Sequence, residues 1–233
     1  MSLYNNRRMI VTVGDSRVGK STVLKLLIDL LLKESQRLKV YNYDNRQKLE
    51  AYKDIIPLEN LNFFRGDGDQ LVEDINQDEI DVILADMPGQ YVDEICDYIE
   101  EIDLFQLLEK YEWKLTFLQP ISHRIDCLKY MEKILNWCGD EASYVVVKNE
   151  YFDSRFYEYN QRKSSEITEI ILTKLHRDHY ESLERLGKPY CQVATEQSLY
   201  LVYRSYIYQW INKFNKSVLE NTIARKYLGL SSF

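Results

Sequence analysis

The sequence predicts an α/β fold: a mostly parallel, doubly wound sheet of about seven strands, covered by helices on both faces. Short apolar runs alternate along the chain with longer segments of helical spacing. The apolar runs are continuous, which is typical of strands buried on both faces. With 233 residues and 45% hydrophobic content, the chain can bury one sizeable core. We therefore treat residues 1–233 as a single domain, in which 150–233 is a tyrosine-rich, mainly helical C-terminal part.

Six apolar runs are the candidate strands. Each is rich in β-branched or aromatic residues and is bounded by polar or turn-forming residues. In chain order they span 9–13, 38–43, 61–64, 82–85, 114–119 and 144–147. The runs VILA and YVVV, fourth and sixth in this order, contain only apolar residues and tyrosine, as expected for interior strands.

The segments between these runs predict helices, because their apolar residues recur with helical spacing. They span 20–33, 47–56 (which stops at Pro57), 69–76, an acidic region after Asp86 that reaches about residue 108, and 123–137. In a sheet of this kind a ligand binds beyond the carboxyl ends of the strands. The residues expected there are Gly14, Asp44, Asp86, Gln119 and Lys148.

Composition narrows the classes of function. No stretch approaches the roughly 20 apolar residues of a transmembrane helix, and the first residues lack a cleavage-site pattern. We expect a soluble, cytoplasmic protein. The four cysteines form no CxxC pair, which argues against a disulfide framework or a zinc site. Residues 66–112 carry sixteen acidic side chains and one Lys, whereas 201–233 carry five basic side chains and one Glu, so DNA contact remains open only through a C-terminal basic face.

The segment GDSRVGKS satisfies the pattern G-x-x-x-x-G-K-[ST] between a predicted strand and a predicted helix. Its glycines permit a tight loop whose N–H groups surround a β-phosphate. Lys20 supplies a positive charge to the β- and γ-phosphates, and the Ser21 hydroxyl binds Mg²⁺. The expected nucleotide-binding residues of this P-loop are Gly14, Asp15, Ser16, Arg17, Val18, Gly19, Lys20, Ser21 and Thr22.

The segment DVILADMPGQ is the second functional signal. An apolar strand delivers Asp86 to the sheet edge, where an NTPase needs a carboxylate to hold magnesium or its water. Pro88 and Gly89 then turn the chain, so that the Gly89 N–H can face a γ-phosphate. We therefore expect Ser21 and Asp86 to hold Mg²⁺.

With these motifs, the chain resembles the ParA and MinD family of P-loop ATPases, in the wider group that includes dethiobiotin synthetase and the CobQ/CobB proteins. The similarity is distributed over residues 8–150, in the P-loop, VYNYDNRQ (40–47), LTFLQPISHRIDCL (115–128) and YVVVKNE (144–150). It implies that Asp44 orients the attacking water, so that the catalytic set is Lys20, Asp44 and Asp86. It also implies that Asn149 reads the base of a Mg²⁺-bound ATP.

The same resemblance implies a slow ATPase switch with a protein partner, possible homodimer formation and a role in plasmid partition, stability or cargo positioning. One departure affects the dimer: the family's signature lysine is replaced by Asp15. Because an unpaired carboxylate near phosphates would repel them, we expect Asp15 to point toward a loop N–H or an arginine. Arg17 is the candidate substitute cation. The less regular loop resembles plasmid stability and conjugative-transfer proteins of the StbB or TraL type.

Two alternatives remain. The P-loop and DMPGQ also resemble motifs of small GTPases that bind GTP, with Gln90 at the water-positioning place, but the guanine-reading NKxD motif is missing. Asp153, four residues past Asn149, is the candidate for a variant arrangement. The other alternative is a small-molecule ligase or kinase similar to dethiobiotin synthetase.

The C-terminal stretch carries an apolar stripe at helical spacing: Leu199, Val202, Tyr206, Trp210, Phe214 and Val218. A final helix that docks on the sheet explains this stripe, and a membrane-binding amphipathic helix is the alternative. The modest basic charge of the stretch favours docking.

Overall fold

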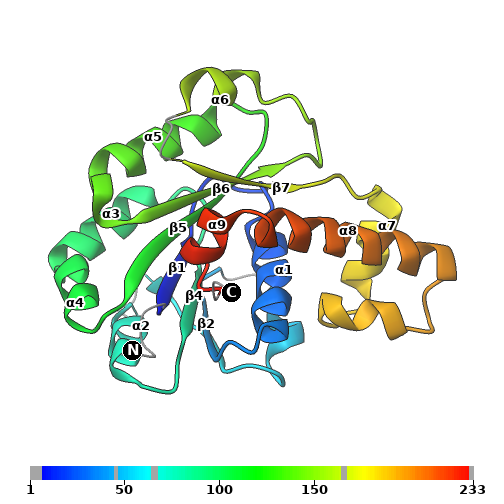
Figure 1. Ribbon diagram of the computed structural model, residues 1–233, viewed down its shortest axis with the longest axis horizontal. Coiled ribbons are helices and arrows are strands. Elements are labelled where there is room, and N and C mark those ends of the chain that lie inside the picture. The colour runs from blue at the N-terminus through cyan, green and yellow to red at the C-terminus, as the bar shows by residue number, and fades with distance from the viewer. Residues whose placement is uncertain (1–6, 45–46, 64–67, 164–166, 231–233) are drawn as a thin grey trace.

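The computed structural model describes residues 7–44, 47–63, 68–163 and 167–230. Within these ranges seven parallel strands form one sheet in the order β3-β2-β4-β1-β5-β6-β7 (Figure 1). The strands are β1 (Arg8–Thr12), β2 (Leu38–Asn42), β3 (Leu58–Asn60), β4 (Val82–Asp86), β5 (Lys114–Ile121), β6 (Ser143–Asn149) and β7 (Thr168–Leu172). The predicted fold class, a parallel doubly wound sheet, is confirmed.

Helices cover both faces of the sheet. One face carries α1 (Lys20–Lys33), α7 (Arg177–Arg185), α8 (Leu201–Leu219) and α9 (Thr222–Tyr227). The other carries α2 (Asp69–Glu73), α3 (Val92–Glu101), α4 (Leu104–Lys110), α5 (Asp126–Cys138) and α6 (Tyr157–Arg162). Because side chains alternate along a strand, Ile10 enters the first core and its neighbours Met9 and Val11 enter the second.

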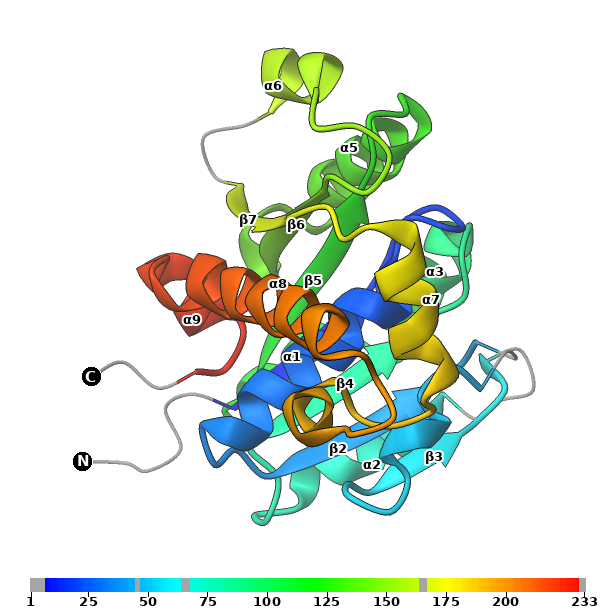
Figure 2. The same cartoon turned by 90° about the vertical axis from the view of Figure 1, so that its right-hand side faces the viewer.

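The register of the sheet positions the P-loop. Thr12 at the end of β1 lies opposite Asp86 on β4 and Leu118 on β5. The loop between β1 and α1 therefore leaves the sheet beside the buried carboxylate of Asp86. Helix α1 is buried along most of its length because it lies between the sheet and α8, a packing visible in Figure 2.

Two predicted elements between β2 and β4 are wrong in detail. Residues 47–56 contain only a 3₁₀ turn, Glu50–Tyr52, in place of a helix, although the spaced apolar residues Leu49, Tyr52 and Ile56 are buried as a helical pattern implies. Strand β3 precedes the expected range 61–64, whose last residue lies outside the described residues. Pairing with β2 starts directly after Pro57, whose carbonyl accepts from the Val40 N–H at 3.0 Å.

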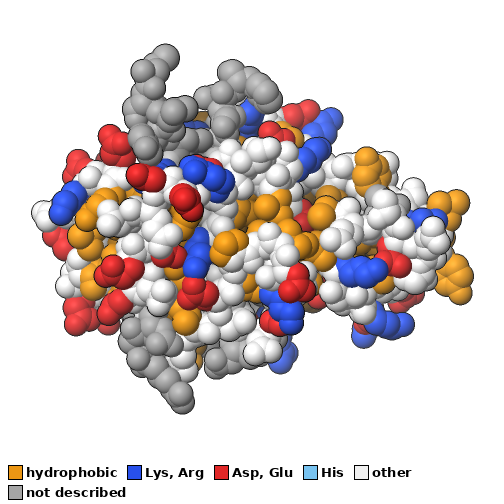
Figure 3. Space-filling model, turned by 90° about the horizontal axis from the view of Figure 1, so that it is seen from below, with side chains coloured by type: hydrophobic (Ala, Val, Ile, Leu, Met, Phe, Trp, Pro, Cys, Tyr) orange, Lys and Arg blue, Asp and Glu red, His pale blue; other side chains and the backbone are white. Residues whose placement is uncertain are grey.

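The C-terminal part contributes more than helices, because β7 pairs with β6 and extends the sheet. Helix α8 docks on this edge, and the Trp210 Nε1–H donates to the Thr173 carbonyl at 2.7 Å. Val202 and Tyr206, at the N-terminal end of the expected apolar stripe, remain exposed. Figure 3 shows apolar side chains at the right-hand end of the molecule, where α8 begins. No helix within the described ranges is both long enough and apolar enough to cross a membrane.

Candidate functional site

The P-loop can turn tightly because both of its glycines occupy the left-handed region. Gly14 has φ 113° and Gly19 has φ 96°. Both are also crowded: a Cβ on Gly14 would lie 3.1 Å from Gln119 Cγ, and one on Gly19 would lie 2.7 Å from Asn149 Nδ2. Glycine is therefore required at both positions for conformation and for space.

Lys20 is held across the loop. Its Nζ donates to the Gly14 carbonyl at 3.2 Å and to the Asp15 carbonyl at 2.8 Å. The residue is only 8% exposed, and burial lowers the pKa of Lys20, an effect that the negative charge of Asp86 opposes. The ammonium group is thus fixed beside the helix N-terminus, where the first N–H groups of α1 have no acceptor within the helix.

Ser21 and Asp86 form a buried pair of oxygen ligands beside Lys20. The Ser21 hydroxyl donates to Asp86 Oδ2 at 2.8 Å, and the Thr12 hydroxyl donates to Oδ1 at 2.9 Å. Thr12 in turn accepts the Met87 N–H at 3.2 Å, which fixes the direction of the chain after β4. Asp86 is 1% exposed, and burial raises the pKa of Asp86 against the effect of these hydrogen bonds. Hydroxyl and carboxylate oxygens are ligands that Mg²⁺ prefers, so the pair fits this ion.

A cavity of about 440 Å³ opens over the loop. Many of the predicted residues line it, from the P-loop, the end of β2 and the turn after β4: Ser16, Arg17, Gly19, Lys20, Ser21, Thr22, Asp44, Pro88 and Gly89. The turn after β4 packs tightly on the P-loop, since a Cβ on Gly89 would lie 2.6 Å from Ser16 Oγ. The structure therefore brings the two sequence motifs together on one cavity.

The remaining predicted residues lie around the cavity, outside its lining. Gly14 lies at the back of the loop against Gln119, Val18 is buried in the core, and Asp86 lies beneath Ser21. Asn149 braces the loop from β6, because its Nδ2 donates to the Val18 carbonyl at 2.9 Å. Its Oδ1 accepts the Tyr151 N–H at 3.1 Å.

Asp15 points away from the cavity. Asp15 is 5% exposed, and its carboxylate forms an ion pair with Arg124 in the loop before α5 and accepts the Ser16 N–H at 2.6 Å. Gln90 Nε2 also donates to it, at 3.2 Å. This arrangement agrees with the prediction that Asp15 faces a loop N–H or an arginine. The Ser16 N–H of the loop is therefore hydrogen-bonded to the Asp15 carboxylate, and the Gln90 side chain is held beside the same carboxylate.

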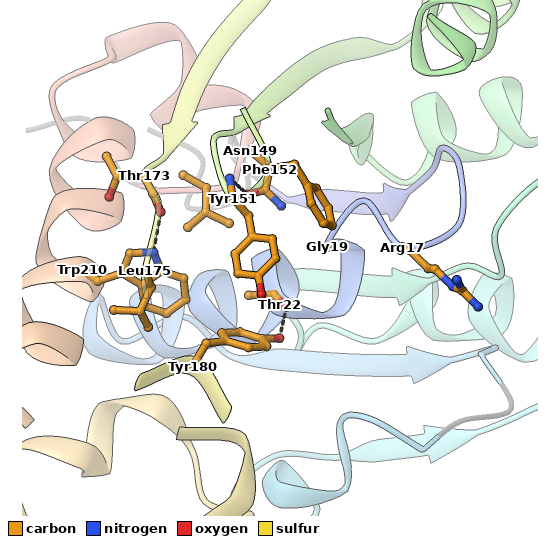
Figure 4. A pocket seen from close by; sticks show the side chains of 11 residues that line it. Arg17, Gly19, Thr22, Asn149, Tyr151, Phe152, Thr173, Leu175, Tyr180 and Trp210 are labelled. Atoms are coloured by element: carbon orange, nitrogen blue, oxygen red, sulfur yellow. Dashed lines mark hydrogen bonds between the residues drawn. The ribbon is translucent and has the colours of Figure 1, made fainter. Parts of the chain in front are cut away.

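A second cavity of about 180 Å³ adjoins the first, and both are lined by Arg17, Gly19, Thr22 and Tyr180. Figure 4 shows its aromatic walls, Tyr151, Phe152 and Tyr180, and shows Arg17 extending away from them. The Tyr180 hydroxyl lies 2.7 Å from the Thr22 hydroxyl. Asn149 also lines this space, whose aromatic walls suit a flat ring.

Sequence reasoning missed several residues of these cavities. Tyr180 comes from α7, more than 150 residues after the P-loop, and nothing in the local sequence connects the two. Lys48, four residues after Asp44, was available as a signal because it is a charged residue next to the expected catalytic loop. Tyr91 follows the DMPGQ segment directly and also lines the first cavity.

The sequence matches no known family model and no curated protein. Solved structures share the fold. The signal recognition particle receptor FtsY from Elizabethkingia anophelis gives a TM-score of 0.51 at 12% identity over 90% of this chain and 65% of its own, so this chain spans slightly less than two thirds of that receptor. The MinD cell division protein from Aquifex aeolicus gives a TM-score of 0.54 at 14% sequence identity. The match covers 93% of this chain and 98% of that protein.

The septum site-determining protein MinD from Pyrococcus horikoshii OT3, complexed with Mg-ADP, gives a TM-score of 0.50 at 15% identity over 91% of this chain and 95% of its own. Identities this low show a shared fold and nothing finer. Together with the parallel sheet and the loop after β1, these similarities confirm the predicted P-loop NTPase fold.

Proposed function

We propose that this chain binds a Mg²⁺-bound nucleoside triphosphate, ATP in preference to GTP, and hydrolyses it slowly as a switch protein. One observation carries the proposal: Lys20, the N-terminus of α1 and Ser21 meet at the same cavity, with the Asp86 carboxylate hydrogen-bonded beneath Ser21. A helix N-terminus and a fixed ammonium group attract phosphate oxygens. Ser21 and Asp86 would hold Mg²⁺, which supplies positive charge to the phosphates.

The aromatic cavity supports adenine as the base. Its walls offer ring contacts, and it adjoins the phosphate cavity at Gly19 and Thr22. Asp153, the candidate guanine-reading carboxylate, pairs instead with Arg155, whose guanidinium lowers the pKa of Asp153. The similar MinD structure complexed with Mg-ADP is consistent with the same choice of base. Asn149 would contribute by bracing the loop and bordering the base.

Hydrolysis and switching are assigned to the two loops that face the phosphates. Asp44 lines the cavity from the end of β2, where it can orient a water toward a terminal phosphate. Gly89 packs directly on Ser16, so a change at the phosphates can move the turn after β4. A protein partner that senses these loops would make the chain a ParA/MinD-like switch, in plasmid partition, stability or cargo positioning. A homodimer and DNA contact through the C-terminal basic residues belong to the same proposal.

Titration calorimetry tests nucleotide binding directly. The wild-type chain should bind MgATP, and Lys20→Ala should give a flat titration while keeping its circular dichroism spectrum. Unlabelled GTP should compete poorly for labelled ATP. Undiminished affinity in Lys20→Ala would remove this residue from the phosphate site, and a clear GTP preference would favour the small-GTPase interpretation.

One observation favours a second candidate, a small-molecule ligase or kinase. A third cavity, of about 600 Å³, lies on the Asp15 side of the loop and also includes Ser16 and Arg17. Its cationic side chains are Arg17, Arg124, Lys129 and Lys133, and an acidic substrate could compete for them with the carboxylates of Asp15, Asp126 and Asp93 that now pair with the last three. Turnover distinguishes the candidates: a basal rate of about one per minute or lower fits a switch, whereas enzymes of metabolism typically reach about 1–1,000 per second.

A further inference from the structure

The phosphate cavity contains a second lysine that no motif assigns. Lys48 lies beyond β2 and lines the same cavity as Lys20, Ser21 and Gly89. Its Nζ forms an ion pair with Asp44 Oδ2 at 3.2 Å. The Lys48 side chain is 41% exposed, so its ammonium group is accessible from the cavity and from solvent.

We propose that Lys48 is a phosphate-binding residue that contacts the terminal phosphate of a bound triphosphate and leaves Asp44 when it does so. This inference rests on the proposed nucleotide-binding function. The Lys48–Asp44 pair is partly exposed, and pairs of this kind are weak. A terminal phosphate carries more negative charge than one carboxylate and offers three acceptor oxygens, so it can compete for the ammonium group.

The charges around the loop favour such a residue. Asp15 adds a carboxylate to the P-loop, and this carboxylate forms an ion pair with Arg124. Among the described residues that line the phosphate cavity, the cationic ones are Arg17, Lys20 and Lys48. Arg17 is exposed at the tip of the loop, whereas Lys48 lines the same cavity from the segment after β2.

The test measures binding without hydrolysis. Calorimetry with a magnesium-bound non-hydrolysable ATP analogue and with MgADP gives two dissociation constants for the wild type, Lys48→Ala and Lys53→Ala. Lys53 is the matched control, an exposed lysine in the same segment that pairs with Glu50 at 2.7 Å. Lys48→Ala should weaken triphosphate binding about tenfold and ADP binding less than about threefold. Lys53→Ala should change neither value.

Asp44→Ala should change triphosphate affinity in the opposite direction to Lys48→Ala. Because it removes the competing carboxylate, triphosphate binding should stay equal or tighten by a few-fold. An unchanged ratio of the two dissociation constants in Lys48→Ala, or equal weakening of both, would overturn the assignment of Lys48 while leaving the nucleotide site intact. A wild-type chain that binds neither nucleotide would instead overturn the proposed function, and the inference with it.

Discussion

Asp29 on α1 is predicted to destabilise the folded protein at neutral pH. It lies in the helix that follows the P-loop, is 6% exposed, and accepts the Cys191 N–H at 2.6 Å. Burial raises the pKa of Asp29 to about 6, against the opposing effect of hydrogen bonds from Cys191 and Tyr52. The ordinary value is 3.8, so the folded protein binds this proton more tightly than the unfolded chain does.

The sign and size of the effect follow from linkage. Where the folded state binds more protons, stability falls as pH rises. The free energy of unfolding should therefore fall between pH 4 and pH 6, as Asp29 loses its proton, and this loss should persist at higher pH. A pKa difference of roughly two units corresponds to about 3 kcal/mol. Asp29→Asn keeps an oxygen that accepts the Cys191 N–H and removes the charge, so it should raise the free energy of unfolding at pH 7 by up to about 3 kcal/mol.

Urea unfolding of both proteins between pH 4 and pH 7.5 measures this difference. The gap between Asp29→Asn and the wild type should widen from pH 4 to about pH 6 and then remain constant. Asp54→Asn is the control, because Asp54 is exposed. Parallel stability curves for the wild type and Asp29→Asn would refute the argument. Nucleotide affinity should not change, because Asp29 lines neither the cavity over the P-loop nor the aromatic cavity beside it.

Three further substitutions test the site and its support. Asp44→Ala should bind MgATP but lose hydrolysis by about a hundredfold; normal phosphate release would assign water orientation elsewhere. Gly89→Ala places a Cβ 2.6 Å from Ser16 Oγ and 3.0 Å from its backbone N, so calorimetry should show weaker nucleotide binding, and unchanged affinity would contradict the packing. Trp210→Phe loses the hydrogen bond to the Thr173 carbonyl and should lower the free energy of urea unfolding by about 1–3 kcal/mol, whereas wild-type stability would contradict this.

The sequence predicted the parts of the site that depend on neighbouring residues. The strand, loop and helix around Lys20 are encoded by a contiguous pattern, and the apolar run before Asp86 predicts a carboxylate at the sheet edge. The contact between Ser21 of the loop and Asp86 also follows from the sequence, because parallel strands place their carboxyl ends at one edge of the sheet.

Other parts depend on contacts between distant segments. Strand β7 was missed because Glu169 interrupts its apolar run, and its position beside β6 decides its structure more than its own residues do. The aromatic cavity combines residues after β6 with Tyr180 from α7. Spacing along the chain contains no information on that approach, which the packing of α7 and α8 on α1 determines.

Asp15, the one departure from the expected P-loop pattern, is part of an ion pair with Arg124. A buried carboxylate is costly without a partner, and Asp15 is only 5% exposed. Arg124, more than 100 residues later, provides a partner together with the Ser16 N–H. The pair neutralises residue 15 within its own chain. A contact from residue 15 to phosphates across a dimer interface is therefore not available in this arrangement. If two copies associate around nucleotide, the bridging cation must come from elsewhere, and Arg17, exposed at the loop tip with φ 64°, is placed to provide it.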